Sequence, residues 1–163
     1  MKKFLNIKNF YIIIFIFSLL SLLVALYIEF FLGYHPCKLC LYQRIPYLIA
    51  IFFTFLGISY YKNLTWLYLL LIIFFSSFLL SGYHFGIEQS IFEEFPGCAG
   101  NSMDITNKNE LLKSLNSDLK SCKNVDFTIF GLSLAAINFL LSFLICILIL
   151  KVLKNEKNKQ KQN

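Results

Sequence analysis

Five cysteines are the residues of this 163-residue chain whose type and spacing could carry chemistry. Cys37 and Cys40 form a C-x-x-C motif within the stretch HPCKLCLYQRIPY, residues 35–47. Cys98 and Cys122 lie in a second polar segment, and Cys146 lies inside the last apolar run. Because paired cysteines persist as disulfides in an oxidising compartment, the four outer cysteines predict two bridges, and spacing alone leaves three possible pairings.

The C-x-x-C motif predicts a reactive disulfide. A bridge closed over two intervening residues is strained, and it is therefore easier to reduce than a structural bridge. Pro36 is tolerated at a helix start, so the first turn of a helix is expected at Cys37 and Cys40. The unpaired N–H groups and the helix dipole stabilise a thiolate there, and a thiol of low pKa is expected at Cys40.

Arg44 follows Cys40 by four residues and therefore shares its helical face. An arginine at a membrane interface often extends its guanidinium to the lipid headgroups. Alternatively, the guanidinium faces a partly buried redox site, where it favours the Cys40 thiolate and donates to a carbonyl oxygen of an apolar ligand. The position of Arg44 relative to Cys40 favours this second interpretation.

The second cysteine pair has two interpretations that the residues leave open. Cys98 and Cys122 are separated by 23 residues, and a disulfide closing such a loop stabilises a fold by about 3 kcal/mol. The intervening segment NELLKSLNSDL places leucines on one face of a helix, which predicts a short amphipathic helix on the bilayer surface. A loop of this kind could instead carry a disulfide from a soluble partner to the first pair.

Long apolar runs predict a membrane protein of the all-α class, since 58% of the residues are hydrophobic and 18% are aromatic. We expect a four-helix transmembrane bundle with spans at about residues 10–32, 41–61, 64–83 and 127–150. The external loops then cover about 33–40 and 84–126, and the second contains the amphipathic helix. Residues 1–153 form one domain, the first run is expected to be an uncleaved anchor, and 154–163 are expected to be a disordered basic tail.

The distribution of charge predicts the orientation of this bundle. Four crossings place both termini on one side, which carries nine lysines against one acidic residue, Glu156. The other side carries six basic against eight acidic residues, and together the two sides give the net charge of +6. Cytoplasmic segments are rich in Lys and Arg, so both termini are expected in the cytoplasm. The same bias explains the basic pI, and no nucleic-acid partner is expected.

Three motifs resemble those of the disulfide bond formation protein B (DsbB) family, which consists of quinone-linked thiol oxidases of the bacterial inner membrane. The motif PCKLCLYQRIPY opens the second span, and SGYHFGIEQ ends the third span with PGCAG after it. The motif CKNVDFTIFGLSLAAIN leads into the fourth span. Residues 101–120 have no counterpart among these motifs.

The resemblance implies an enzyme of the bacterial inner membrane, with cytoplasmic termini, that reoxidises a periplasmic DsbA-type thiol oxidase. The electrons would pass to a membrane quinone, either ubiquinone or menaquinone. The resemblance also implies the disulfides Cys37–Cys40 and Cys98–Cys122. Cys98 would form the mixed disulfide with the soluble partner, and Cys122 would attack the first bridge. A monomer is expected.

Three residues would meet the quinone by the same resemblance. Cys40 would lie against it, Arg44 would polarise it, and His84, near the end of the third span, would lie close to it. A lone histidine at a membrane interface is otherwise usually structural.

Three other classes of protein are considered. A metal site could use His35, Cys37, Cys40 and His84, although the second cysteine pair lacks the close spacing of zinc sites. A non-enzymatic membrane protein could use both disulfides only as staples. A quinone reductase of the vitamin K epoxide reductase type also has four spans, but its C-x-x-C motif lies near the last span instead of opening the second.

Overall fold

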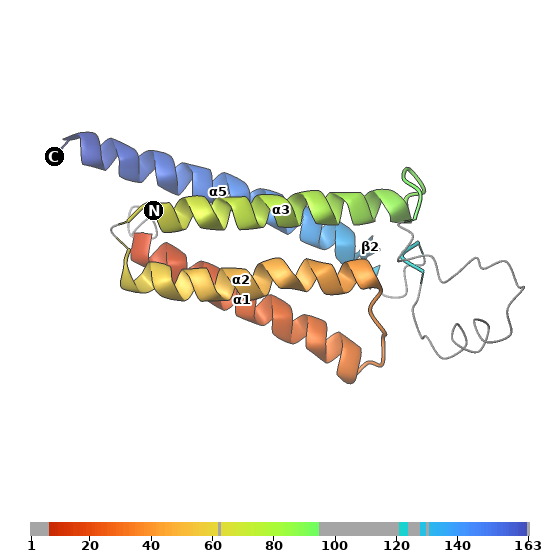
Figure 1. Ribbon diagram of the computed structural model, residues 1–163. Helices are drawn as coiled ribbons and strands as arrows, with labels where there is room; N and C mark the ends of the chain where they lie inside the picture. Colours follow the sequence, from red (N-terminus) through yellow and green to blue (C-terminus); the bar gives the residue numbers. More distant parts are fainter. Residues whose placement is uncertain (1–6, 62, 95–120, 124–127, 130, 163) are drawn as a thin grey trace, which may run out of the picture.

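The computed structural model of the chain describes residues 7–61, 63–94, 121–123, 128–129 and 131–162. Within these ranges the helices are α1 (Ile7–Phe30), α2 (Lys38–Ser59), α3 (Thr65–Glu88) and α5 (Leu134–Gln162). Each of these four helices is long and apolar enough to cross a membrane. They lie side by side in one bundle (Figure 1), so the predicted all-α membrane fold is confirmed.

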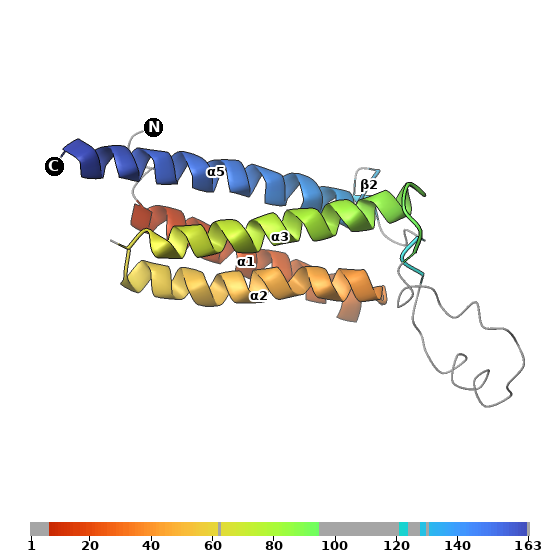
Figure 2. The ribbon, with the colours of Figure 1, turned by 45° about the horizontal axis from the view of Figure 1, so that its top comes forward.

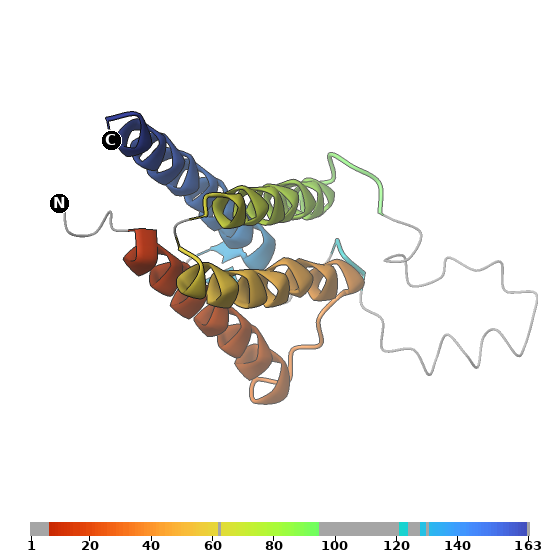
Figure 3. The same cartoon turned by 60° about the vertical axis from the view of Figure 1, so that its left-hand side comes forward.

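The end of α1, the start of α2, the end of α3 and the start of α5 lie together at one end of the bundle (Figures 1 and 2), which we call the loop end. The start of α1, the turn between α2 and α3, and the end of α5 lie at the opposite end (Figures 1 and 2). α1 packs on α2, α2 on α3, and α3 on α5. Towards its end at Phe30, α1 diverges from α2, as both Figure 1 and Figure 3 show. Most of the second loop, including Cys98 and the predicted amphipathic helix, lies outside the described residues.

The bundle has apolar side chains on its outer faces and small polar side chains between its helices. Hydroxyl side chains are fully buried at Ser18, Thr54, Ser77, Ser81 and Ser142. Thr54 donates to the carbonyl of Ala50 at 2.7 Å, and Ser81 donates to that of Ser77 at 2.7 Å. Large apolar side chains are exposed along each helix, for example Leu20, Phe52, Ile72 and Leu140. This arrangement suits a lipid environment, where small residues permit close packing and polar groups need partners inside the protein.

Gly57 permits the close contact between α1 and α2. A Cβ atom at this position would lie 2.5 Å from the ring of Tyr11, which is fully buried. We expect Gly57→Ala to lower the free energy of unfolding by about 1–3 kcal/mol, because the Tyr11 ring and the facing helix must move. The thermal unfolding midpoint in detergent measures this effect. Ser59→Ala, two residues further on, is the control and should change stability by less than about 0.5 kcal/mol; equal midpoints for the two variants would contradict this account.

The third span is longer than predicted. The sequence predicts its end at residue 83, whereas α3 continues to Glu88. The helix ends because Ser90 adopts a positive φ of 58° and the N–H of Ile91 returns to the carbonyl of Gly86 at 2.8 Å. The additional turn incorporates His84 and Glu88 into the helix, so that His84 contacts Gln43 of α2 and Glu88 contacts Ser133 of β2.

The fourth span begins later than predicted. The sequence predicts a start at residue 127, but β1 (Thr128–Ile129) and β2 (Leu132–Ser133) first form a short antiparallel hairpin. Gly131 has a φ of +79° in the turn, a conformation that glycine adopts without strain. Oγ of Ser133 then accepts the N–H of Ala136 at 3.1 Å, as a helix cap does.

The prediction of a disordered tail at residues 154–163 is wrong over most of its length, because α5 continues to Gln162. Lys, Glu and Gln have good helix propensity, and a helix already nucleated by the span extends easily. Two contacts support the extension: Lys159 pairs with Glu156 at 2.5 Å, and Nζ of Lys157 lies 5.3 Å from the ring centroid of Tyr68 on α3.

Candidate redox site

The two cysteines of the C-x-x-C motif lie at the start of α2, as predicted. Cys37 is the N-cap residue, and its Sγ accepts the N–H of Cys40 at 3.3 Å. The two Sγ atoms are 2.9 Å apart, and both thiols are free. Only a small movement separates this arrangement from a disulfide, whose Sγ atoms lie about 2 Å apart. The motif therefore holds its sulfurs ready to exchange between the dithiol and the disulfide.

Cys37 is the sulfur whose pKa is lowered by the surrounding contacts. Its Sγ accepts the N–H of Cys40 at 3.3 Å, and it lies 2.9 Å from Sγ of Cys40 and 3.6 Å from Nε2 of His84. These contacts, the Cys40 hydrogen bond first, lower the pKa of Cys37 to about 4 against the opposing effect of burial. The sequence predicts the low pKa at Cys40 instead; the structure differs because the sulfur at the N-cap receives the hydrogen bonds.

This low pKa predicts how the reduced protein reacts with an alkylating reagent. A group with a pKa near 4 is a thiolate at all higher pH values, so the rate of Cys37 alkylation should be flat between about pH 6 and about pH 8. The rate should fall only as the pH approaches the pKa from above. Peptide mass spectrometry measures the reaction at Cys37 alone.

Cys40→Ala provides the matched comparison for the alkylation experiment. It removes the hydrogen bond that lowers the pKa of Cys37 most. The rate in this variant should rise with pH over the same range, by up to about tenfold per pH unit. A wild-type rate that climbs in the same way would contradict the assignment of the lowered pKa to Cys37.

Cys122 lies beside this first pair. It is 2% exposed and disulfide-bonded, and it packs in one buried cluster with Cys37 and Ile87. Its Sγ, the Sγ of Cys37 and a ring nitrogen of His84 lie within 4.8 Å of one another. The structure thus brings one cysteine of each predicted pair together. The predicted partner of Cys122, Cys98, lies outside the described residues.

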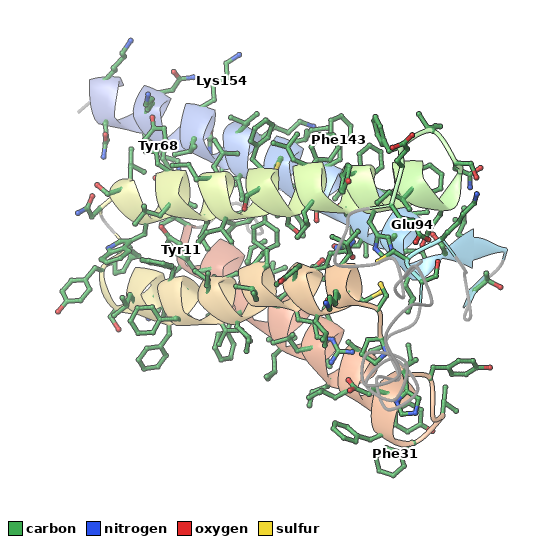
Figure 4. All side chains as sticks on the ribbon, turned by 45° about the vertical axis from the view of Figure 1, so that its right-hand side comes forward. Tyr11, Phe31, Tyr68, Glu94, Phe143 and Lys154 are labelled. Atoms are coloured by element: carbon green, nitrogen blue, oxygen red, sulfur yellow. The ribbon has the colours of Figure 1, made fainter. Side chains whose placement is uncertain are left out.

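Glu94 holds the segment around Cys122 against the end of α3. Its carboxylate accepts the hydroxyl of Ser121 and the N–H of Lys123, the latter at 3.0 Å. Figure 4 shows Glu94 at the same end of the bundle as Phe31, opposite Tyr68 and Lys154. The contact joins residues 121–123 to the segment that follows α3.

His84 is the centre of a buried polar cluster that joins three helices. Nε2 of Gln43 lies 2.9 Å from Nδ1 of His84, and Oε1 of Gln43 accepts Nδ2 of Asn138 at 3.0 Å. The carboxylate of Glu88 lies 3.7 Å from Nε2 of His84 and accepts the hydroxyl of Ser133. The sequence analysis singled out His84 but missed Gln43 and Glu88. The one signal was their polar type within otherwise apolar helices.

Arg44 pairs with a residue that the sequence analysis did not select. Its Nη1 donates to Oε2 of Glu29 on α1 at 2.5 Å, and the two side chains are 19% and 22% exposed. Arg44 nevertheless lines the same cavity as Cys40. The ion pair engages Nη1, and a guanidinium carries five N–H donors, so others remain for a ligand. The predicted place of Arg44 beside the redox site therefore agrees with the structure, with Glu29 as an additional contact.

A cavity of about 390 Å³ lies at the loop end of the bundle. Its walls are largely apolar and come from α1, α2, α5 and the segment before α2. The polar groups that line it include Cys37, Cys40, Arg44, His84 and Cys122. Its size and its mixture of apolar walls with few polar groups suit a small apolar ligand.

The metal alternative of the sequence analysis obtains a different set of ligands from the structure. In the described part of the chain, the atoms close enough to share an ion belong to Cys37, His84 and Cys122, and this group does not include His35. A sulfur within a disulfide is not a thiolate ligand, so Cys122 could bind an ion only after reduction.

Comparison with known proteins identifies the family. The family model of the disulfide bond formation protein DsbB matches residues 7–152. A protein of Rickettsia prowazekii (strain Madrid E), described as uncharacterized protein RP370, is 34% identical over 139 residues, which cover 81% of this chain and 78% of that protein. The family model covers α1, α2 with the C-x-x-C motif, α3, and α5 up to residue 152. The chain is a multi-pass membrane protein that belongs to the DsbB family of disulfide bond formation proteins.

Proposed function

We propose that this protein is a membrane thiol oxidase that reoxidises a periplasmic DsbA-type thiol oxidase and transfers the electrons to a membrane quinone. One observation carries the proposal. The Sγ atoms of Cys37 and Cys122 lie within 4.8 Å of each other at a largely apolar cavity, which Cys40 and Arg44 also line. This geometry supports a path from sulfur to sulfur that ends beside an apolar ligand.

The exchange between the two pairs can be written atom by atom. After the soluble partner has reduced Cys98 and Cys122, the Cys122 thiolate attacks Sγ of Cys37. A Cys122–Cys37 bond forms, the Cys37–Cys40 bond breaks, and Cys40 leaves as a thiolate. The Cys98 thiolate then attacks Sγ of Cys122. A Cys98–Cys122 bond forms, and Cys37 leaves as a thiolate. The first pair has gained two electrons, and the second pair is again a disulfide.

The residues of the cavity fit a quinone. Apolar walls accept a lipid-soluble ring, and the guanidinium of Arg44 can donate to a carbonyl oxygen. A bound quinone accepts two electrons and two protons, which the reduced Cys37/Cys40 pair must lose to close its bridge again. Cys40 is the sulfur of this pair on the span itself, one helical turn before Arg44. An electron acceptor other than a dithiol pair is needed, because DsbA-type partners have a reduction potential of about −120 mV, which is higher than that of most dithiol pairs.

The orientation follows from the same proposal. The redox cysteines belong on the oxidising side, so the loop end of the bundle faces the periplasm and the inner membrane is the location. The lysine-rich end of α5 then faces the cytoplasm, in agreement with the excess of basic residues there.

Reconstitution tests this function directly. Purified protein is mixed with a reduced DsbA-type oxidase and a soluble quinone analogue, and quinone absorbance is followed over time. We expect loss of the quinone signal in step with oxidation of the partner. Oxidation of the partner without quinone reduction would contradict the proposed acceptor, and no oxidation of the partner would contradict the proposed donor.

A metal site is the second candidate, since Cys37, His84 and Cys122 place three possible ligand atoms close together. It predicts that the reduced protein retains zinc or copper after dialysis. Elemental analysis of wild type and His84→Ala would separate the two functions, because only a metal site loses bound ion in that variant.

A further inference from the structure

A line of buried amide and hydroxyl groups runs from the redox cysteines into the bundle. It begins at His84 on α3, passes through Gln43 on α2 and reaches Asn138 on α5. Gln43 is 8% exposed and His84 is 3% exposed. Gln43, His84 and Asn138 also line the cavity, and each of them has a hydrogen-bond partner within the protein.

The hydroxyl of Tyr47 determines which groups in this line donate hydrogen bonds and which accept them. It donates to Oδ1 of Asn138 at 2.5 Å, and the hydroxyl of Ser142 lies 3.2 Å from the same oxygen. If the Asn138 amide were turned over, its N–H group would face Tyr47, and the phenol proton would lose this acceptor. Oδ1 of Asn138 is therefore the acceptor, and its Nδ2 is the donor.

The same order of donor and acceptor continues from Asn138 through Gln43 to His84. Oε1 of Gln43 accepts from Asn138, so Nε2 of Gln43 faces Nδ1 of His84 as a donor. A ring nitrogen that accepts a hydrogen bond does not carry the proton of a neutral imidazole. The proton of His84 consequently resides on Nε2, the nitrogen that lies 3.6 Å from Sγ of Cys37.

We propose that Gln43 and Asn138 are positioning residues, whose amide groups hold the proton of His84 on Nε2, where the ring offers it to the sulfur of Cys37. The carboxylate of Glu88 lies on the same side of the ring, 3.7 Å from this nitrogen. With the opposite tautomer, a lone pair would face Cys37 and would accept a hydrogen bond from its thiol, which favours the protonated form of Cys37.

The position of this proton favours Cys37 as a thiolate, the form from which the reduced pair closes its bridge when two electrons and two protons pass to the quinone. This role in turnover rests on the proposed function, whereas the position of the proton does not. Neither Gln43 nor Asn138 touches a redox sulfur in the contacts of the described residues. Their effect on Cys37 passes through the imidazole ring.

Nitrogen-15 NMR of labelled histidine tests the proposal. The chain contains two histidines, so a His35→Gln background leaves His84 as the only labelled ring. At about pH 8, above the ordinary pKa of histidine, we expect an unprotonated Nδ1 and a protonated Nε2. A protonated Nδ1 in this otherwise wild-type protein would overturn the proposal.

In the same His35→Gln background, Asn138→Asp should reverse the order of hydrogen-bond donors and acceptors, while the side chain at position 138 keeps nearly the same shape. A carboxylate only accepts, so Gln43 must turn its N–H group to residue 138 and its oxygen to His84, and Nδ1 should gain the proton. Ser142→Ala is the matched control: it removes a hydroxyl at the same Asn138 oxygen but leaves this order unchanged, so Nδ1 should stay unprotonated. An Asn138→Asp protein with an unprotonated Nδ1 would overturn the proposal.

Cys37→Ala tests the contact with the sulfur. In the reduced protein it should shift the Nε2 resonance and leave Nδ1 unprotonated; an unshifted Nε2 resonance would show that the proton does not face Cys37. None of these measurements uses quinone or a soluble partner. A wild-type protein that fails to reduce quinone would therefore refute the proposed function alone, and a wrong tautomer with normal turnover would refute the positioning role alone.

Discussion

Cys40→Ser should reduce quinone reduction by about a thousandfold or more in the reconstituted assay, because one atom of the sulfur relay is lost. Without Sγ of Cys40, Cys37 is a free thiol with no disulfide bond that Cys122 could attack, and it cannot close a bridge that releases electrons to the quinone. The quinone absorbance should remain constant after the reduced partner is added. Normal turnover in this variant would reject the assignment of the C-x-x-C motif.

Two variants show whether the loss in Cys40→Ser is specific. Cys146 lies in the buried core between helices, within a cluster that includes none of the other cysteines; Cys146→Ala should keep turnover within about twofold. Cys98→Ser should abolish oxidation of the partner while quinone binding is retained, because the proposed mixed disulfide precedes every step at the cavity. Loss of quinone binding in Cys98→Ser would contradict the role of Cys98 in exchange with the soluble partner.

The helices were predictable because apolar length alone identifies a membrane span, whereas their ends were not. α3 passes its predicted end because Ser90 adopts a left-handed conformation beyond Glu88, and hydropathy carries no information about a single φ angle. α5 begins late because a hairpin with Gly131 in its turn consumes residues that look like the start of the span. The same helix runs past residue 153 because good helix formers continue it and Lys157 packs on Tyr68.

The site was predictable where chemistry follows from neighbours in the sequence. Cys37, Cys40 and Arg44 lie within one short motif, and helical spacing places them together. Contacts between helices carry no such signal: Gln43 and Asn138 are 95 positions apart, and Arg44 and Glu29 are 15 positions apart on different helices. The sequence shows that a polar residue lies in a span, but it does not show which polar residue of another helix is its partner.

The distribution of charge between the two sulfurs was the least predictable feature. Helix position alone favours any cysteine of the first turn, and it does not distinguish Cys37 from Cys40. The structure makes the distinction through two contacts with Cys37, the thiol of Cys40 and the ring of His84. Cys37 is thus the sulfur that forms a thiolate more readily, and Cys40 is the sulfur nearer to the membrane span.

Arg44→Leu should raise the KM for quinone by about tenfold to a hundredfold, since a charged hydrogen bond to a carbonyl oxygen contributes about 1.5–3 kcal/mol. The same variant should lower the unfolding midpoint by about 2–6 °C, because Glu29 is left without its partner in a partly buried place. Steady-state kinetics at saturating partner and thermal unfolding in detergent measure the two effects separately.

The double variant Glu29→Leu/Arg44→Leu separates ligand binding from structure. Removing both charges leaves no unpaired carboxylate, so the unfolding midpoint should recover most of its loss, while the KM for quinone should stay high. If the KM recovered together with the midpoint, Arg44 would serve only the ion pair with α1. Arg44→Lys should give an intermediate KM, because an ammonium keeps the charge but lacks the planar fork that can hold Glu29 and a carbonyl oxygen at once. This outcome would make Glu29 the residue that aims the guanidinium and Arg44 the residue that meets the ligand.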